Sequence, residues 1–479
     1  MHRKILDVID GWYRSEYRSA LMIRGARQVG KTYAVEMYCD LNRIHHLKID
    51  LSKDSRSREV FDGDLTVDAI ILGLSAIHTG FEFIPDRTLI FLDEIQECPN
   101  ARTALKSFAT DKRYRVIASE SLLGLKMKSV KLPPTGYVES VDMRPMDFEE
   151  FLWALGVPQA AIDAVRTSIS ACAPIDGSLF DTFSGYYRWY IAVGGMPDAV
   201  RSFVESKQFG PVRNAQSMIV EGYKDDIRKH IDDMKLRAEV ESCFDAVPRM
   251  LAAENKRFVF NDIDGKGEGS GKGYYDGYDR YAPALEWLSM ADVALTCRRV
   301  SEMHMPLKER TRGNMFKLYM LDTGILMNLY EPELVGEVVM GNVGVNHGAI
   351  AENAIAQALV AQGRDLYYCH DSNKRMKVDF VSVIDGTICA IEVKSGNNRT
   401  CSSLNKAVRD LGLKGIMFET RNCFEDDKGI RHYPLFAASF LDSIDRYEMP
   451  VFDPSGIDRL KAEYGSPDDA RTRQKKDYL

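Results

Sequence analysis

The sequence lacks the features of a membrane, secreted or disulfide-bonded protein. No stretch of its 479 residues is an uncharged apolar run of the roughly 18 residues that cross a bilayer, and the N-terminus has no apolar run typical of a signal peptide. The nine cysteines are scattered, odd in number and never spaced as Cys-x-x-Cys, which argues against a disulfide framework or a zinc knuckle. We therefore expect a cytoplasmic protein with reduced thiols and no membrane partner.

An excess of positive charge is also absent. Acidic residues number 70 and basic residues 63, giving a net charge of −7. This balance argues against a protein that coats nucleic acid through its overall charge, while a local basic face stays possible. At about 150 residues per domain, the length suggests roughly three folded units.

The sequence does contain a phosphate-binding motif. A short apolar run, 21–23, leads into a glycine-bounded loop and then into a helix-compatible segment, which is the order that a P-loop requires. Backbone N–H groups of such a loop bind the phosphates of ATP. Lys31 would stabilise the β and γ phosphates, and Thr32 would bind Mg²⁺. The candidate nucleotide-binding residues are Gly25, Ala26, Arg27, Gln28, Val29, Gly30, Lys31 and Thr32.

Two carboxylates follow a second apolar run, 88–92. Ligands of open α/β sheets bind at the carboxyl ends of the strands, so Asp93 is placed to hold Mg²⁺ and Glu94 to polarise an attacking water. This pair favours hydrolysis over phosphoryl transfer to a hydroxyl, as in a small-molecule kinase. The alternative is a helix N-cap and a first-turn acid. Ser119 is a candidate γ-phosphate sensor.

The order of elements predicts an α/β protein with several domains. Apolar runs at 21–23, 46–51, 88–92 and 116–118 are separated by helix-length segments, which indicates a parallel sheet covered by helices on both faces. Helical patterns dominate from about 180 to 260, and the glycine-rich stretch 264–277 is typical of a mobile loop or the wing of a winged helix. We predict an ATPase core at 1–156, a helical and winged-helix-like middle at 157–312, a C-terminal α/β domain at 313–445 and a polar tail at 446–479.

Several segments together resemble a known family. They are GARQVGKT, FLDEIQECP, ASESLLG, MRPMDFEEFLWALG, VGGMPDAV, MFKLYMLDTGIL and VDFVSVIDGTICAIEVKSG, in this order. They resemble a large prokaryotic family of AAA-type ATPases whose C-terminal domain of unknown function is similar to the restriction-endonuclease-like, PD-(D/E)xK fold. The resemblance spans about residues 1–445 and implies an AAA-type core that uses ATP and Mg²⁺, a winged-helix-like middle and a nuclease-like end.

The sequence departs from the family at two places. Relatives carry a basic residue where this chain has Tyr137, so no arginine finger is evident, and Arg27, Arg113 and Arg144 are the candidates. A neighbouring copy in a homo-oligomer could supply the arginine instead. Relatives also carry an acid just before VDF, whereas Lys377 and Val378 precede Asp379 here.

A second set of candidate residues lies in the C-terminal part. A metal-dependent phosphodiesterase needs carboxylates for Mg²⁺ or Mn²⁺ and a lysine to stabilise charge. The candidates are Glu352, on a helix predicted at 348–362, and Asp379, Glu392 and Lys394.

A predicted hairpin brings two of these carboxylates together. Asp385-Gly386 is a type I′ turn signal, which pairs Ile384 with Thr387 and, further along both strands, Asp379 with Glu392. Opposed residues have Cβ atoms about 4.5–5.5 Å apart, close enough for both carboxylates to bind one cation. Lys394 would share their face. The alternative is a hairpin whose acids are offset by Lys377 and Lys394.

Two functions fit these patterns. The first is an ATPase coupled to a C-terminal domain that acts on or binds DNA. Its basic contacts would come from Lys256, Arg257, Arg298 and Arg299, which could equally be a solvated face. The second is an ATP-switched regulatory or binding protein whose nuclease fold is catalytically inactive.

Overall fold

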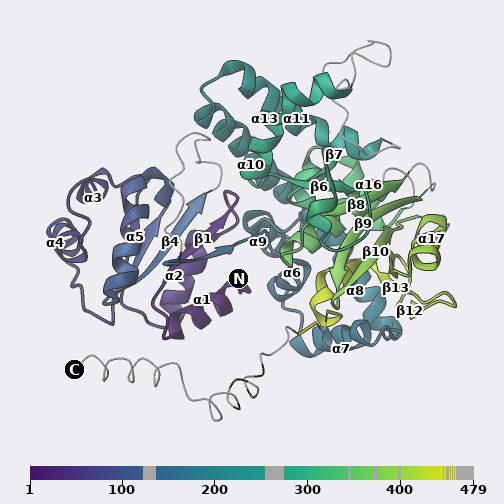
Figure 1. Ribbon diagram of the computed structural model, residues 1–479, viewed down its shortest axis with the longest axis horizontal. Coiled ribbons are helices and arrows are strands. Elements are labelled where there is room, and N and C mark those ends of the chain that lie inside the picture. Colours follow the sequence, from purple (N-terminus) through teal and green to yellow (C-terminus); the bar gives the residue numbers. More distant parts are fainter. Residues whose placement is uncertain are drawn as a thin grey trace, which may run out of the picture.

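The computed structural model separates an N-terminal α/β lobe from a larger body made of helices and a second sheet (Figure 1). It describes residues 1–121, 136–253, 274–342, 347–371, 376–396 and 401–445, and isolated positions beyond 446, except for the side chains of 274–279, 312–314 and 347. Within these ranges no helix is both long enough and apolar enough to cross a membrane. The predicted tail, 446–479, falls almost wholly outside the described residues.

The N-terminal lobe is built on a five-stranded sheet in the order β2-β3-β4-β1-β5. All neighbouring strands are parallel, which confirms the predicted parallel core. Strand β3 is buried along its whole length, as its continuous apolar sequence requires. The strands are β1 Ala20–Gly25, β2 His46–Asp50, β3 Leu89–Asp93, β4 Arg115–Ser121 and β5 Val138–Asp142. The helices are α1 Ile5–Arg14, α2 Lys31–Leu41, α3 Ser55–Val60, α4 Val67–Ile77 and α5 Pro99–Asp111.

The segment after the sheet is helical. Asp147 and Glu150 form a capping box at the start of α6, with each side chain bonded to the backbone N–H of the other. Proline occupies the first turn of α9, where its missing N–H costs nothing. The helices are α6 Phe148–Ala154, α7 Gln159–Ser170, α8 Gly177–Val193, α9 Pro197–Ser206, α10 Phe209–His230, α11 Met234–Ala252 and α13 Tyr274–Met290.

The C-terminal sheet begins before residue 312, where the sequence predicts the start of the C-terminal domain. Strand β6 (Ala294–Val300) pairs with β7 (Thr311–Met320), so both belong to the C-terminal sheet and the sheet begins before residue 300. The glycine-rich stretch lies outside the described residues up to 273, and its last residues begin α13. The described part of the middle segment before β6 contains only helices, so it displays no wing.

The C-terminal sheet is mixed and has eight strands in the order β12-β13-β11-β10-β9-β8-β6-β7. The central hairpin has the predicted register, since Thr387 pairs with Ile384 and Ile391 with Phe380. Asp385 and Gly386 have the positive φ angles of a type I′ turn. The remaining strands are β8 Tyr367–Asp371, β9 Met376–Ile384, β10 Thr387–Val393, β11 Lys414–Glu419, β12 Phe424–Glu425 and β13 Ile430–Pro434. The helices are α14 Thr323–Asn328, α15 Glu333–Met340, α16 His347–Ala361 and α17 Ser402–Leu411.

The turn between α8 and α9 interlocks with the start of α14. A Cβ atom on Gly194 would lie 2.1 Å from a carboxylate oxygen of Asp322, and one on Gly324 would lie 2.2 Å from the backbone oxygen of Val193. A Cβ atom on Gly195 would lie 2.0 Å from the backbone oxygen of Met146. Only glycine therefore fits at these three contacts.

We expect Gly195→Ala to destabilise the protein by roughly 2 kcal/mol or more, because the obstructing atom is backbone and cannot swing aside. Gly185→Ala is the matched control, since a Cβ atom in that part of α8 would meet only the tip of Arg188, at 3.9 Å. That change should be neutral or stabilise the helix by up to about 1 kcal/mol. Urea denaturation measures both, and equal stabilities of the two variants would contradict the interlocked packing.

Candidate functional site

The P-loop curls between β1 and α2 through three unusual backbone angles. Gly25, Gln28 and Gly30 have positive φ angles, and Gly30 is the N-cap of α2. A Cβ atom on Gly25 would lie 2.2 Å from the backbone oxygen of Met143, so no side chain is tolerated there. The loop thus places the N-terminus of α2 where phosphate groups bind.

Lys31 is buried inside this loop. Its Nζ donates to the backbone oxygens of Gly25, at 3.1 Å, and Ala26, at 2.9 Å, and to Oγ of Ser121, at 3.2 Å. Burial lowers the pKa of Lys31, although the nearby acids, Glu94 first among them, act in the opposite direction. The ammonium is therefore held in the loop by three acceptors of the chain, which the oxygens of a bound phosphate could replace.

Asp93 lies next to Thr32, as the sequence predicts. The Thr32 hydroxyl donates to both oxygens of Asp93, at 3.0 and 3.1 Å, and the Ser119 hydroxyl donates to the same carboxylate. Burial raises the pKa of Asp93, while these two hydrogen bonds lower it. Hydroxyl and carboxylate oxygens are the ligands that Mg²⁺ prefers, so Thr32 and Asp93 fit this ion.

Glu94 is positioned by two residues that the sequence reasoning missed. Its carboxylate accepts from the Ser121 hydroxyl, at 3.0 Å, and from the Gln96 side chain. Ser121 lines the cavity in front of the P-loop, whereas Ser119 is fully buried behind it and accepts from the N–H of Glu94. The structure thus gives Ser119 a role in holding the two acids and places Ser121, two residues later, against the cavity.

A cavity of about 470 Å³ lies in front of this loop. Glu94, Lys31 and Thr32 line one end. The walls also come from the N-terminus, from Met146 and from α9. The hydrophobic side chains of the lining are Met1, Tyr33, Met146, Pro197 and Val204. The cavity lining therefore combines the polar groups of the P-loop with hydrophobic side chains, as a nucleotide requires.

The arginines at this cavity are not those expected from the sequence. Arg3 and Arg201 line it among the described residues, and Arg27, Arg113 and Arg144 do not. Arg27 is paired with Asp226 of α10, Arg144 with Asp292, and Arg113 with Asp111 and Asp68. Arg27, Arg144 and Arg113 therefore hold neighbouring segments together. Of the two arginines that line the cavity, Arg201 on α9 is the exposed one.

The C-terminal candidates also come together. Lys394 Nζ lies 2.8 Å from Glu392, and the N–H of Val393 donates to Asp379 at 3.1 Å. Burial raises the pKa of Glu392 to about 7, and the charge of Asp379 adds to this shift. Glu352 on α16 accepts from Tyr319, at 3.0 Å, which completes the predicted set.

One member of this cluster was not predicted. Lys317 of β7 lies with its Nζ 3.3 Å from Glu352. Burial opposes its charge, but Glu352 and Asp379 outweigh burial and raise the pKa of Lys317. The signal in the sequence is a lysine inside the otherwise apolar strand MFKLYML. Among the described residues, no three His, Cys, Asp or Glu side chains are placed to hold a metal ion.

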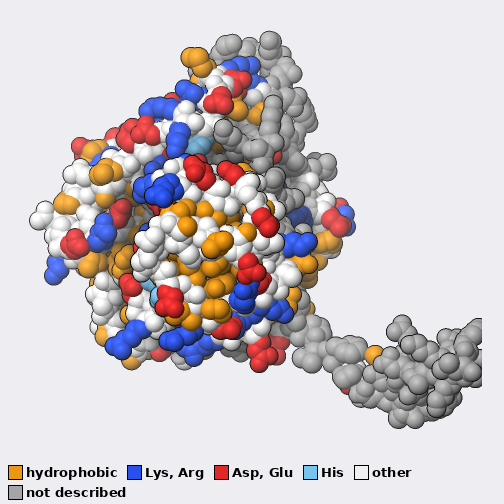
Figure 2. All heavy atoms as spheres, turned by 90° about the vertical axis from the view of Figure 1, so that its left-hand side faces the viewer, with side chains coloured by type: hydrophobic (Ala, Val, Ile, Leu, Met, Phe, Trp, Pro, Cys, Tyr) orange, Lys and Arg blue, Asp and Glu red, His pale blue; other side chains and the backbone are white. Residues whose placement is uncertain are grey.

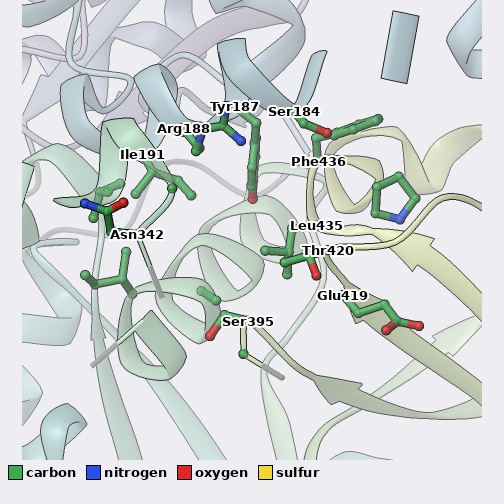
Figure 3. Close-up of a pocket in the computed structure, with 16 residues that line it drawn as sticks. Ser184, Tyr187, Arg188, Ile191, Asn342, Ser395, Glu419, Thr420, Leu435 and Phe436 are labelled. Carbon is green, nitrogen blue, oxygen red and sulfur yellow. The ribbon is translucent and has the colours of Figure 1, made fainter. Parts of the chain in front are cut away.

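A second cavity, of about 280 Å³, lies beside this cluster. Figure 3 shows Tyr187 and Arg188 of α8 on one side, with Ser395, Thr420 and Glu419 across from them. Ser395 directly follows Lys394, but the described lining contains none of the four predicted C-terminal residues. The carboxylates are therefore closed off from this cavity.

Two of the four predicted basic contacts, Arg298 and Arg299, lie in the described residues. Arg298 is exposed, while Arg299 donates to the backbone oxygen of His370. Lys256 and Arg257 lie outside the described residues. On the face turned to the viewer in Figure 2, basic and acidic side chains alternate around a group of hydrophobic ones. That face is therefore no basic surface for DNA.

Comparison with known proteins agrees with the N-terminal site. Residues 17–152 match the family described as AAA domain, residues 184–333 a domain of unknown function (DUF8612), and residues 347–431 a second one (DUF4143). No match was found among curated proteins. The chain therefore carries an N-terminal AAA-type ATPase domain and a C-terminal DUF4143 domain.

Solved structures show only distant similarity. Caenorhabditis elegans PCH-2 is 14% identical over 46% of this chain and 67% of its own, with a TM-score of 0.26. The Thermotoga maritima RuvB Holliday junction branch migration motor is 13% identical over 62% of this chain and 87% of its own, with a TM-score of 0.27. At these TM-scores neither structure adds to the assignment.

Lys31→Ala should abolish ATP binding, because it removes the ammonium that lies at the mouth of the loop. Isothermal titration calorimetry measures the affinity. Lys235→Ala, at an exposed position in the first turn of α11, is the control and should bind like the parent. Equal affinity of Lys31→Ala and the parent would show that the loop binds no phosphate.

Proposed function

We propose that the protein hydrolyses ATP with Mg²⁺ at the cavity in front of the P-loop. The observation that carries this proposal is that Lys31, Thr32 and Glu94 line that cavity, with Asp93 bonded directly to Thr32. Binding alone would need only the lysine and the loop. The additional carboxylate of Glu94 at the cavity is what a reaction with water requires.

Each residue has a separate task in this reaction. Thr32 and Asp93 hold Mg²⁺, which when bound neutralises charge on the phosphates. Lys31 stabilises the negative charge that develops on the transferred phosphoryl group. Glu94 orients the attacking water and accepts its proton, and Ser121 keeps the carboxylate turned to the cavity.

The hydrophobic part of the cavity lining supports a ligand with a purine base, such as ATP. A purine base is a flat apolar body that packs against side chains such as Met146, Pro197 and Val204. Arg201 lies on the same helix as Pro197 and Val204, and its ion pair with Asp198, at 2.8 Å, leaves it largely exposed. We assign Arg201 to a phosphate oxygen of the bound nucleotide.

The C-terminal domain is the proposed target of the ATPase. Both alternatives from the sequence remain as proposals: a domain that acts on DNA, and a regulatory domain with an inactive nuclease fold. Met146 at the cavity and Gln357 on α16 both contact Tyr190, which supports a link between the two parts. Phosphate release and plasmid cleavage, measured on one sample with ATP and Mg²⁺ or Mn²⁺, distinguish the alternatives.

Glu94→Gln should still bind ATP but hydrolyse it at least about 10²-fold more slowly, because the amide cannot accept a proton from water. Phosphate release and nucleotide affinity are both measured. Glu97→Gln is the matched control, since Glu97 is exposed and lies only three residues further on. An unchanged rate in Glu94→Gln would mean that this acid has a structural role.

Arg201→Ala should lower kcat by about 10-fold or more if this arginine contacts the phosphates. Arg228→Ala is the control, because Arg228 has the same spacing from its partner, Asp225, as Arg201 has from Asp198 but lies away from the cavity. If Arg201→Ala hydrolyses ATP normally and activity falls on dilution, a neighbouring copy supplies the arginine instead.

A further inference from the structure

The C-terminal carboxylate cluster has its own cations. Lys317 Nζ lies 3.3 Å from Oε2 of Glu352, and Lys394 Nζ lies 2.8 Å from Oε1 of Glu392. Asp379 accepts from the backbone N–H of Val393. The acids are each at least 90% buried, so they require compensating charge or hydrogen bonds nearby.

The two lysines differ in their access to water. The side chain of Lys394 is 26% exposed and that of Lys317 only 2%. The Lys317 ammonium lies 5.1 Å from the ring centre of Tyr368 and 5.8 Å from that of Phe380, and it donates to the Tyr319 hydroxyl. Aromatic faces stabilise a desolvated cation. Lys317 is therefore built into the core of the domain and cannot turn out into solvent.

A divalent metal does not fit this arrangement. Mg²⁺ or Mn²⁺ bound to Glu352 would share a carboxylate with the buried ammonium, and their positive charges would repel in a medium that screens poorly. Among the described residues, Glu392 Oε2 is the one carboxylate oxygen of the set that is buried without a hydrogen-bond partner, and it offers a single ligand. The described residues form no group of three acids, His or Cys able to hold a metal.

We propose that Lys317 is the resident cation of this cluster, in the position that a nuclease-like domain would give to a divalent metal. The C-terminal domain then binds no metal at Glu352, Asp379 and Glu392, and it cuts no phosphodiester bond by metal-dependent chemistry. The buried ion pair of Lys317 with Glu352 holds α16 against strand β7. This proposal is independent of ATP hydrolysis at the P-loop.

The first test measures Mn²⁺ binding to the full chain without nucleotide, by electron paramagnetic resonance. We expect Asp379→Asn and the parent to bind the same amount of Mn²⁺. Any binding that both proteins show should disappear in Asp93→Asn, which removes the ligand at the P-loop. A Mn²⁺ site in the parent that is lost in Asp379→Asn would overturn the proposal, as would plasmid cleavage lost in the same variant.

The second test removes the resident cation. Lys317→Met should lower Tm by several degrees, because three buried acids then have one lysine between them, and millimolar Mn²⁺ should restore part of the loss. Lys414→Met is the control: Lys414 is exposed and pairs with Asp385 at 3.2 Å, so its Tm should not respond to Mn²⁺.

A Lys317→Met variant that folds and shows no Mn²⁺-dependent gain in Tm would contradict the assigned position of the cation. If this variant does not fold, Lys317→Arg keeps the charge and should have a Tm closer to that of the parent, without any Mn²⁺ response. The measurement on the parent and Asp379→Asn needs no variant at residue 317, so it decides the proposal in either case.

Discussion

The buried carboxylate of Asp322 is the interaction on which the arrangement of the chain depends. Asp322 is fully buried, accepts from the N–H of Gly195 at 2.6 Å, and caps α14 through the N–H of Ile325 at 3.1 Å. Burial raises its pKa to about 6, while these backbone hydrogen bonds act to lower it. One side chain thus joins the α8–α9 turn to the start of α14.

Hydrogen bonds connect Asp322 with residues near both candidate sites. Gln357 of α16 donates to Asp322 at 3.2 Å and to the Tyr190 hydroxyl, which in turn donates to the backbone oxygen of Met146. Met146 lines the nucleotide cavity, and its N–H donates to the backbone oxygen of Gly195. Glu352 lies on the same helix as Gln357. Hydrogen bonds thus connect Met146, at the cavity in front of the P-loop, with the helix that carries Glu352.

The sequence allowed prediction wherever the cause is local. A P-loop is a contiguous motif, so Lys31 and Thr32 could be assigned without the fold. The Asp385-Gly386 turn fixes the pairing of its own two strands, which brings Asp379 and Glu392 together. The N-terminal sheet followed from its apolar runs for the same reason, because a buried parallel strand is hydrophobic on both faces.

The residues that were missed depend on contacts between distant segments. Arg201 lies 169 residues after Thr32, and it reaches the cavity in front of the P-loop because α9 forms part of the cavity wall. Strand β6 looked like part of the middle segment because one of its partners, β8, follows it only after β7 and three helices, α14, α15 and α16. The lysine inside the apolar strand MFKLYML is a local signal, but its partner Glu352 lies 35 residues further along the chain. The local pattern marks Lys317 as unusual without identifying its partner.

The two acidic pairs show how neighbours decide what a carboxylate can do. Asp93 and Glu94 are oriented by hydroxyls and by an amide, Lys48 Nζ lies 3.9 Å from Asp93, and Glu94 faces a cavity. Asp379 and Glu392 lie on two paired strands, beside Lys317 and Lys394. The first pair can accept a cation and a proton from outside the chain. In the proposed arrangement the chain's own lysines partly compensate the second pair, so its carboxylates serve to hold the domain together.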